Sequence, residues 1–278
     1  MDYSAHPHMA LDLPSISSLS TEPILFSQVP ALATVHDKLV SFMDGTPSLA
    51  NPGKIKNDLA QNVFPWLKQR YVEKSKVPPS PVVVAAVSQT ISTLATTLPA
   101  ASLFPLLDIW RLAILEPTIA PAMLAPLVKV LTSTSESLSS SPRATVLTLL
   151  RLASNALGTS LSRTLLAADP RARAALTNVL VQTLLHSDRL VRVAAASLAF
   201  NVGAWVQKGR VARVSGEEGA SVDGIRAGEE DGEWEVELVS AVIEALANEE
   251  ESEDAGEFFF FIFDLFALAH TVILITER

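Results

Sequence analysis

Residues 145–157 have the sequence TVLTLLRLASNAL, and this stretch decides the fold class. Its apolar residues are spaced i, i+3, i+4, i+7 and i+11: Val146, Leu149, Leu150, Ala153 and Leu157. Steps of three and four residues place side chains on one face of an α-helix, whereas a half-buried strand would show strict alternation. The stretch therefore predicts an amphipathic helix, and Gly158 follows where a glycine often caps one.

The same helical spacing recurs on both sides of this stretch. Asp169-Pro170 supplies an N-cap and a first helical residue for a helix that we expect to reach about His186. Asp188 is placed to cap the next helix, whose apolar face extends from 191 to 205. Further amphipathic segments are predicted between about 31 and 131, separated by prolines at 78–81, 99 and 117, and another over 234–246; a serine-rich break at 132–142 follows the first group. No stretch with strand alternation and hairpin turns occurs, so strands are not expected.

These segments predict an all-α fold, an armadillo-like α-solenoid of stacked helix pairs. The alternative is a compact, irregular helical bundle. A closed bundle would need some helices that are apolar all round, whereas nearly every segment here has one apolar face, which favours the solenoid. We divide the chain into a linker or exposed arm at 1–22, a helical domain at 23–250 with an acidic loop at 209–233, and an apolar tail at 251–278.

The composition excludes several classes of function. The 278 residues include no cysteine, which removes disulfides, thiolate metal sites and thiol nucleophiles together. The five histidines include no pair at the i, i+4 spacing of a helical metal site. No G-x-S-x-G, Gly-rich phosphate loop or HExxH motif occurs. We therefore expect a protein that is not an enzyme and that needs no cofactor or metal.

The net charge of −9 is unevenly distributed along the chain. Residues 140–214 contain ten Arg and Lys against two Asp, a net charge of +8, whereas residues 215–257 have a net charge of −15. Such asymmetry is typical of a protein that binds a charged partner or screens itself. Nucleic-acid binding is a second class of function, but the acidic loop and the lack of aromatic residues among the arginines argue against it.

Six residues are candidate partner contacts. Arg151 and Asn155 lie four residues apart, so one helix surface presents a cation for a carboxylate and an amide for a peptide backbone. The structural alternative is that Asn155 binds a carbonyl of the next helix while Arg151 is solvated. The remaining candidates are Arg111, Arg189, Arg192 and Trp205, the last as an apolar anchor. Asn201 lies nearer the apolar side of its helix, where we expect a buried structural role.

Three stretches resemble the PUL domain, the armadillo-like helical module of phospholipase-A2-activating protein and its relatives. They are SLFPLLDIWRLAILEP at 102–117, TVLTLLRLASN at 145–155 followed by Leu165-Leu166, and VRVAAASLAFN at 191–201. The resemblance covers about residues 20–248. It implies a non-enzymatic adaptor of the ubiquitin system that docks, through a basic groove, on the acidic C-terminal tail of the ubiquitin-selective AAA ATPase, valosin-containing protein. The location that it implies is the cytoplasm, the nucleus or both.

The resemblance also supplies an alternative. Some relatives contain this domain behind a desumoylating or deubiquitinating PPPDE peptidase and a thioredoxin fold, and this chain is then the C-terminal scaffold of such a protein. Without cysteine, the chain itself holds neither the peptidase nucleophile nor the thioredoxin pair. Other proteins of the ubiquitin pathway are further candidate partners.

The C-terminal tail departs from the family. Residues 258–275, FFFFIFDLFALAHTVILI, are apolar at almost every position and show no helical face. Their length is at the lower limit of a membrane span, and Asp264 and His270 interrupt the run. Three interpretations stay open: an end that derives from an alternative transcript or an incorrect gene boundary, a buried last helix, and a tail anchor. The abrupt change of character favours the first, and we expect membrane contact only through this tail.

We predict that the tail makes the product poorly soluble or membrane-adherent while residues 31–248 stay helical. A solenoid needs a terminal helix that is polar on its outer side, and this tail would leave an apolar surface exposed. The full chain is compared with one that ends at Asp254, by sedimentation and by flotation with liposomes. Equal solubility, with a lower melting temperature for the shorter chain, would show instead that the tail is a capping helix.

Overall fold

Helices make up most of the computed structural model, which describes residues 22–160, 162–163, 166, 169–214 and 233–248. These residues contain no strand, as the sequence predicts. In chain order the helices are α2 (Leu32–Asp44), α3 (Pro52–Asp58), α4 (Phe64–Leu67), α5 (Pro81–Thr97), α6 (Phe104–Ala113), α7 (Ala120–Glu136), α8 (Arg143–Ala156), α10 (Pro170–Leu184), α11 (Arg189–Val214) and α12 (Glu233–Asn248). Two π-helical turns, Leu59–Val63 and Lys68–Val72, extend α3 and α4.

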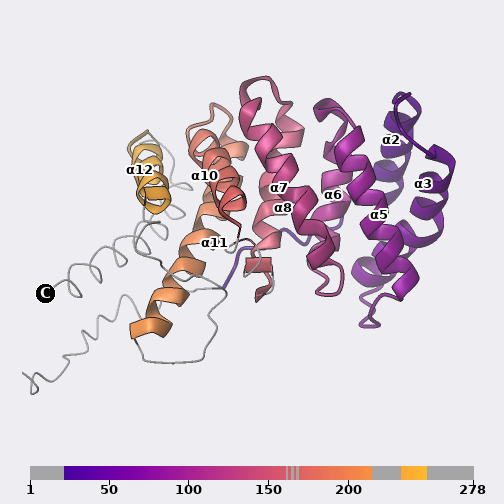
Figure 1. The fold of residues 1–278 in the computed structure, drawn as a ribbon, viewed down its shortest axis with the longest axis horizontal. Coiled ribbons are helices and arrows are strands. Elements are labelled where there is room, and N and C mark those ends of the chain that lie inside the picture. The colour runs from indigo at the N-terminus through magenta and orange to yellow at the C-terminus, as the bar shows by residue number, and fades with distance from the viewer. Residues whose placement is uncertain (1–21, 161, 164–165, 167–168, 215–232, 249–278) are drawn as a thin grey trace, which may run out of the picture.

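The helices stack side by side into an elongated array of two rows (Figure 1). In the first row α6, α8 and α11 pack against one another in this order, and α2 packs against α6. In the second row α5, α7, α10 and α12 pack in the same way. Contacts of α5 with α6, α7 with α8 and α10 with α11 join the two rows. The predicted solenoid of stacked helix pairs is confirmed, and the bundle alternative is not.

Capping residues in the sequence fix several helix starts. The Asp169 carboxylate accepts a hydrogen bond from the Arg171 N–H, with Pro170 as the first residue of α10. Asp188 accepts from the N–H groups of Leu190 and Val191 at the start of α11. A side-chain hydrogen bond from Arg143 of α8 to Asp188 lowers the pKa of this carboxyl group below its ordinary value and ties the two helices together. Both predicted N-caps are therefore confirmed.

Two predicted boundaries are wrong because helices continue through polar sequence. Helix α7 extends to Glu136, well inside the serine-rich break expected at 132–142. There the hydroxyls of Thr132 and Ser133 bind carbonyls one turn earlier in their own helix, so these polar side chains are satisfied without ending the helix. Helix α11 extends to Val214, inside the acidic loop expected at 209–233. The loop residues 215–232, the arm residues 1–21 and the whole predicted tail, 251–278, lie outside the described residues.

A single apolar core runs between the two rows. It includes fully buried side chains from α6 and α8 of the first row and from α7 and α10 of the second, among them Leu107, Leu150, Leu127 and Val179. Among the described helices, one has an apolar window long enough to cross a membrane, Arg189–Val206 of α11. Since 78% of this window is buried inside the array, α11 is explained as a core helix.

Candidate functional site

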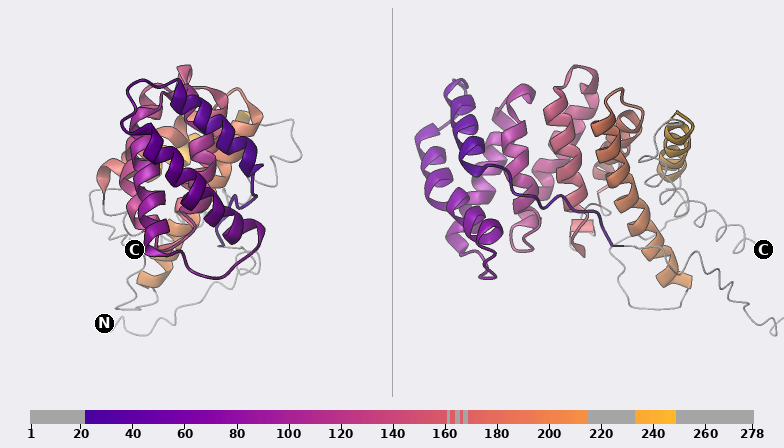
Figure 2. Two further views of the ribbon diagram at one scale, coloured as in Figure 1. Left: turned by 90° about the vertical axis from the view of Figure 1, so that its right-hand side faces the viewer. Right: turned by 180° about the vertical axis from the view of Figure 1, so that it is seen from behind.

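An extended segment, residues 22–31, runs along the first row of helices, and we call it the strap. It starts beside α11, passes α8 and α6 and leads into α2, so that its direction is opposite to the order of the helices (Figure 2). Three side chains hold its backbone, one each from α11, α8 and α6. The strap therefore connects helices that are far apart in the sequence.

Two buried asparagines bind alternate residues of the strap. The Asn201 Oδ1 atom accepts from the Ile24 N–H at 2.7 Å, and its Nδ2 atom donates to the Ile24 carbonyl at 2.9 Å. Asn155 binds Phe26 in the same way, at 2.7 and 3.0 Å. Because residues two apart present their N–H and C=O groups to the same side, the strap is extended here.

The same carboxamides also join neighbouring helices of the row. Asn155 donates to the Arg111 carbonyl of α6 at 2.6 Å, and Asn201 donates to the Ser154 carbonyl of α8 at 3.2 Å. Each asparagine thus bridges the strap and the preceding helix. Asn201 therefore has the buried structural role expected of it, whereas Asn155 binds a carbonyl of the preceding helix and not of the next one. The sequence did not reveal that the strap is a second partner of both.

Arg111 is the third residue that holds the strap. It donates to the Phe26 carbonyl at 2.6 Å and to the Gln28 carbonyl at 2.7 Å, while its Nε atom pairs with Asp108 at 2.6 Å. Its side chain is almost completely buried. Since its charge is balanced by Asp108 and its donors are used by the strap, Arg111 has little left to offer to a partner.

Arg151 also lies beside the strap, but it forms neither the ion pair nor the hydrogen bonds to strap carbonyls that Arg111 forms. Its guanidinium group lies 5.5 Å from the centre of the Phe26 ring, a cation–π contact. Its Nε atom is buried without a hydrogen bond, and Arg151 forms no ion pair with any described residue. Burial, reinforced by the nearby charge of Arg111, lowers the pKa of Arg151 from its ordinary value. Arg151 is thus a half-buried cation without a carboxylate.

Gly158 makes room for the strap. A Cβ atom at this position would lie 2.8 Å from the Leu25 Cδ2 atom and 3.0 Å from the Asn155 carbonyl oxygen, both too close for ordinary contact. The residue does not adopt the left-handed conformation that would make a glycine necessary as a helix cap. The predicted capping role is therefore corrected: the close approach of Leu25 explains the glycine better.

The other candidate contacts do not meet the strap. Trp205 is 4% exposed and belongs to the core, so the expectation of an accessible anchor is wrong. Arg192 donates to the carbonyls of His186 and Ser187, and Arg189 is exposed at the first residue of α11. Nine and twelve residues separate them from Asn201, which places them about 14 and 18 Å along the helix axis from the level of the strap. A role for these two arginines in partner binding stays a prediction.

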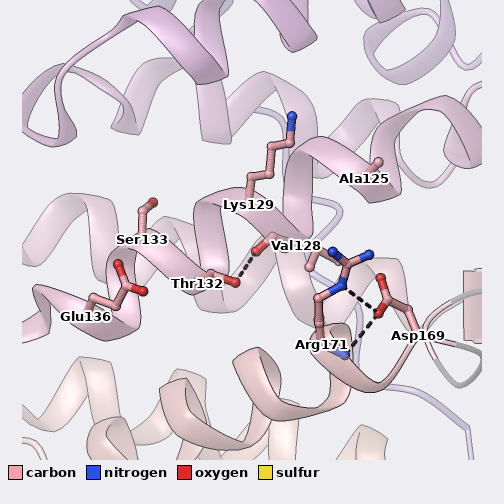
Figure 3. A pocket seen from close by; sticks show the side chains of 8 residues that line it. All are labelled: Ala125, Val128, Lys129, Thr132, Ser133, Glu136, Asp169 and Arg171. Carbon is pink, nitrogen blue, oxygen red and sulfur yellow. Dashed lines mark hydrogen bonds and ion pairs between the residues drawn. The ribbon is translucent and has the colours of Figure 1, made fainter.

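The second row contains a pocket of about 410 Å³ between α7 and the start of α10 (Figure 3). Several of its polar groups are engaged locally: Thr132 donates to the Val128 carbonyl, Ser133 donates to the Val130 carbonyl, and Arg171 contacts Asp169 at 3.5 Å. In the part of the chain that the structure describes, no group of three or more His, Asp and Glu side chains could hold a metal ion. We therefore place the candidate functional site at the strap.

The comparison with protein families identifies this architecture. The family model of the PUL domain matches residues 20–257, which include the strap and both rows of helices. The resemblance found from the three sequence stretches is thereby confirmed over most of the chain. A comparison with curated proteins finds no match.

We predict that Asn155→Ala and Asn201→Ala each lower the free energy of unfolding by about 2–3 kcal/mol, because buried backbone groups of the strap and a neighbouring helix lose their partner. Asn178→Ala, at an exposed position of α10, is the matched control and should change it by less than about 0.5 kcal/mol. Urea denaturation measures all three variants. Equal effects at all three positions would contradict the structural role of the two buried carboxamides.

Gly158→Ala should lower the free energy of unfolding by about 1–2 kcal/mol, since the new methyl group collides with Leu25 and a backbone carbonyl. Leu25→Ala in the same chain removes one of the two clashes and should recover part of the loss. Gly53→Ala is the control, because nothing lies within 4 Å of a Cβ atom there. Strictly additive effects of Gly158→Ala and Leu25→Ala would mean that the two residues do not touch.

Proposed function

The chain belongs to the PUL domain family, and on this premise we propose that it is a non-enzymatic adaptor of the ubiquitin system. Its proposed partner is the acidic C-terminal tail of the ubiquitin-selective AAA ATPase, valosin-containing protein, in the cytoplasm or the nucleus. The PUL domain is a protein-interaction module and not a catalytic family. The proposed docking surface is the one around Arg151, beside the strap.

The unpaired charge of Arg151 supports this proposal most directly. A half-buried guanidinium group has lost part of its hydration. The charge of Asp108 acts on Arg151 from a distance, but no described carboxylate forms an ion pair with it. An incoming carboxylate would form a charge-assisted hydrogen bond worth about 1.5–3 kcal/mol. A peptide that carries several acidic groups, or a free C-terminal carboxylate, has the chemistry that this position lacks.

The strap stays in place in this proposal. Displacing it would leave the carboxamides of Asn155 and Asn201 and the guanidinium of Arg111 without their acceptors inside the array. Because unsatisfied buried polar groups cost about 1–3 kcal/mol each, a short tail peptide gains more by binding next to the strap than by replacing it. Arg111 and Asn155 accordingly shape the surface and are not themselves the contacts.

The alternative function is that of a C-terminal scaffold in a PPPDE–thioredoxin protein. In that case too, the tail of the AAA ATPase would bind the surface around Arg151. In that setting the tail of the AAA ATPase would recruit whatever precedes the helical array. The binding experiment below applies equally to both cases, because it measures the array alone against the tail.

We predict that Arg151→Glu weakens binding of a synthetic acidic tail peptide at least about tenfold, because a charge-assisted hydrogen bond is replaced by repulsion between like charges. Lys129→Glu makes the same change of charge at an exposed position of α7 in the second row and should leave the affinity within about twofold. Isothermal titration calorimetry at physiological salt gives both dissociation constants.

Circular dichroism melting of Arg151→Glu accompanies the titration, since the variant also loses the contact with Phe26. An unchanged melting curve with weakened binding assigns the loss to the interface. Unchanged affinity in a folded Arg151→Glu variant, or equal weakening by Lys129→Glu, would remove Arg151 from the docking surface.

A further inference from the structure

The strap has a second backbone edge that the array does not use. Along an extended chain the N–H and C=O groups of successive residues point to opposite edges. Ile24 and Phe26 direct both groups to side chains of the array, and Gln28 directs its carbonyl to Arg111. The backbone groups of Leu25 and Ser27 form no hydrogen bond with any residue that the structure describes. Among the described residues, nothing pairs with the edge that faces away from the array, and we call it the open edge.

This open edge is accessible and short. Leu25 is 41% exposed, and Ser27 is also exposed. Pro23 and Pro30 bracket the segment, and neither residue has an N–H group to extend a ladder of hydrogen bonds. Proteins commonly limit exposed strand edges in this way, which restricts pairing to a short extended segment. The geometry thus suits a peptide of a few residues and not a long strand.

Positive charge lies beside the open edge. Arg151 lies over the ring of Phe26. Phe26 is the residue between Leu25 and Ser27, whose backbone groups are not bonded to any described residue. A peptide paired with the edge would therefore pass the Arg151 guanidinium group. Charge complementarity selects an acidic peptide over a neutral or basic one.

We infer that the strap is a preformed edge strand onto which an acidic peptide adds by backbone pairing with Leu25 and Ser27. The inference rests on the proposed function and specifies its mode of binding. The pairing supplies affinity that does not depend on the side chains of the peptide, while Arg151 selects for acidic residues. The asparagines and Arg111 hold the strap rigid, so that little conformational entropy is lost when the peptide binds.

The test uses three synthetic peptides with the acidic C-terminal sequence of valosin-containing protein. One is unmodified, and the other two are N-methylated on the backbone at odd or at even positions, so that all side chains and charges are kept. In a paired strand only one of the two sets faces the strap. We expect one methylated peptide to bind at least about tenfold more weakly, from the loss of about two hydrogen bonds, and the other to bind within about threefold of the parent.

Amide hydrogen exchange of the protein, followed by NMR, gives an independent readout. Saturating unmodified peptide should slow exchange at Leu25 and Ser27, while Ile24 and Phe26, already bonded to asparagines, serve as internal controls. Ser27→Pro removes one outward N–H and should weaken binding by about fivefold to tenfold, whereas Ser27→Ala keeps the backbone and should bind like the parent.

The outcomes separate this inference from the proposed function. If the unmodified peptide binds but both methylated peptides bind equally well and Leu25 and Ser27 stay unprotected, the edge pairing is wrong and the adaptor function stands. If the unmodified peptide does not bind, the proposed function fails and the inference fails with it. Protection at Leu25 and Ser27 together with a difference between the two methylated peptides establishes the pairing.

Discussion

The carboxamides of Asn155 and Asn201 impose the constraint on which the rest of the site depends. Both lie inside the array, where an amide without partners would cost about 1–3 kcal/mol per unsatisfied group. Carbonyls of neighbouring helices satisfy one donor of each, and the extended backbone of the strap offers an N–H and a C=O to the rest. The strap meets that demand, and its position follows from the positions of two side chains.

The strap also changes how the array holds together. In a helical repeat array each unit contacts its neighbours, so stability is close to a sum of local terms. Here one short segment binds residues that are 177, 129 and 85 positions away along the chain. Loss of α6, α8 or α11 therefore also removes one of the side chains that hold the strap. This coupling keeps the surface beside the strap in one geometry, which favours binding without rearrangement.

Two arginines at the strap differ in what surrounds them. Arg111 has Asp108 one turn away on its own helix and two strap carbonyls within hydrogen-bond distance, so its charge is used inside the protein. Arg151 has an aromatic ring on one side and the charge of Arg111 nearby, and no described acid pairs with it. Arg111 is therefore a structural cation, whereas Arg151 is the cation that a carboxylate of a partner would bind.

The open edge and the unpaired guanidinium complement each other as recognition elements. Backbone pairing tolerates almost any extended sequence, whereas a half-buried cation discriminates strongly by charge. A surface that combines the two can bind a short acidic segment without a deep pocket. The 410 Å³ pocket of the second row, by contrast, has its hydroxyls and its Asp169–Arg171 pair engaged locally and offers no comparable combination.

Helical spacing, proline breaks and the caps at Asp169 and Asp188 were sufficient to predict the all-α solenoid, because these signals act over one or two turns of chain. The ends of α7 and α11 were mispredicted because both helices continue through polar sequence. In α7 the serine and threonine hydroxyls bond to carbonyls of their own helix. The sequence pointed to six candidate contacts, of which Arg111, Arg151 and Asn155 lie at the strap. Only the tertiary structure decided their roles, because a segment without periodicity, residues 22–31, lies across helices up to 177 positions away, and no local pattern encodes such a contact.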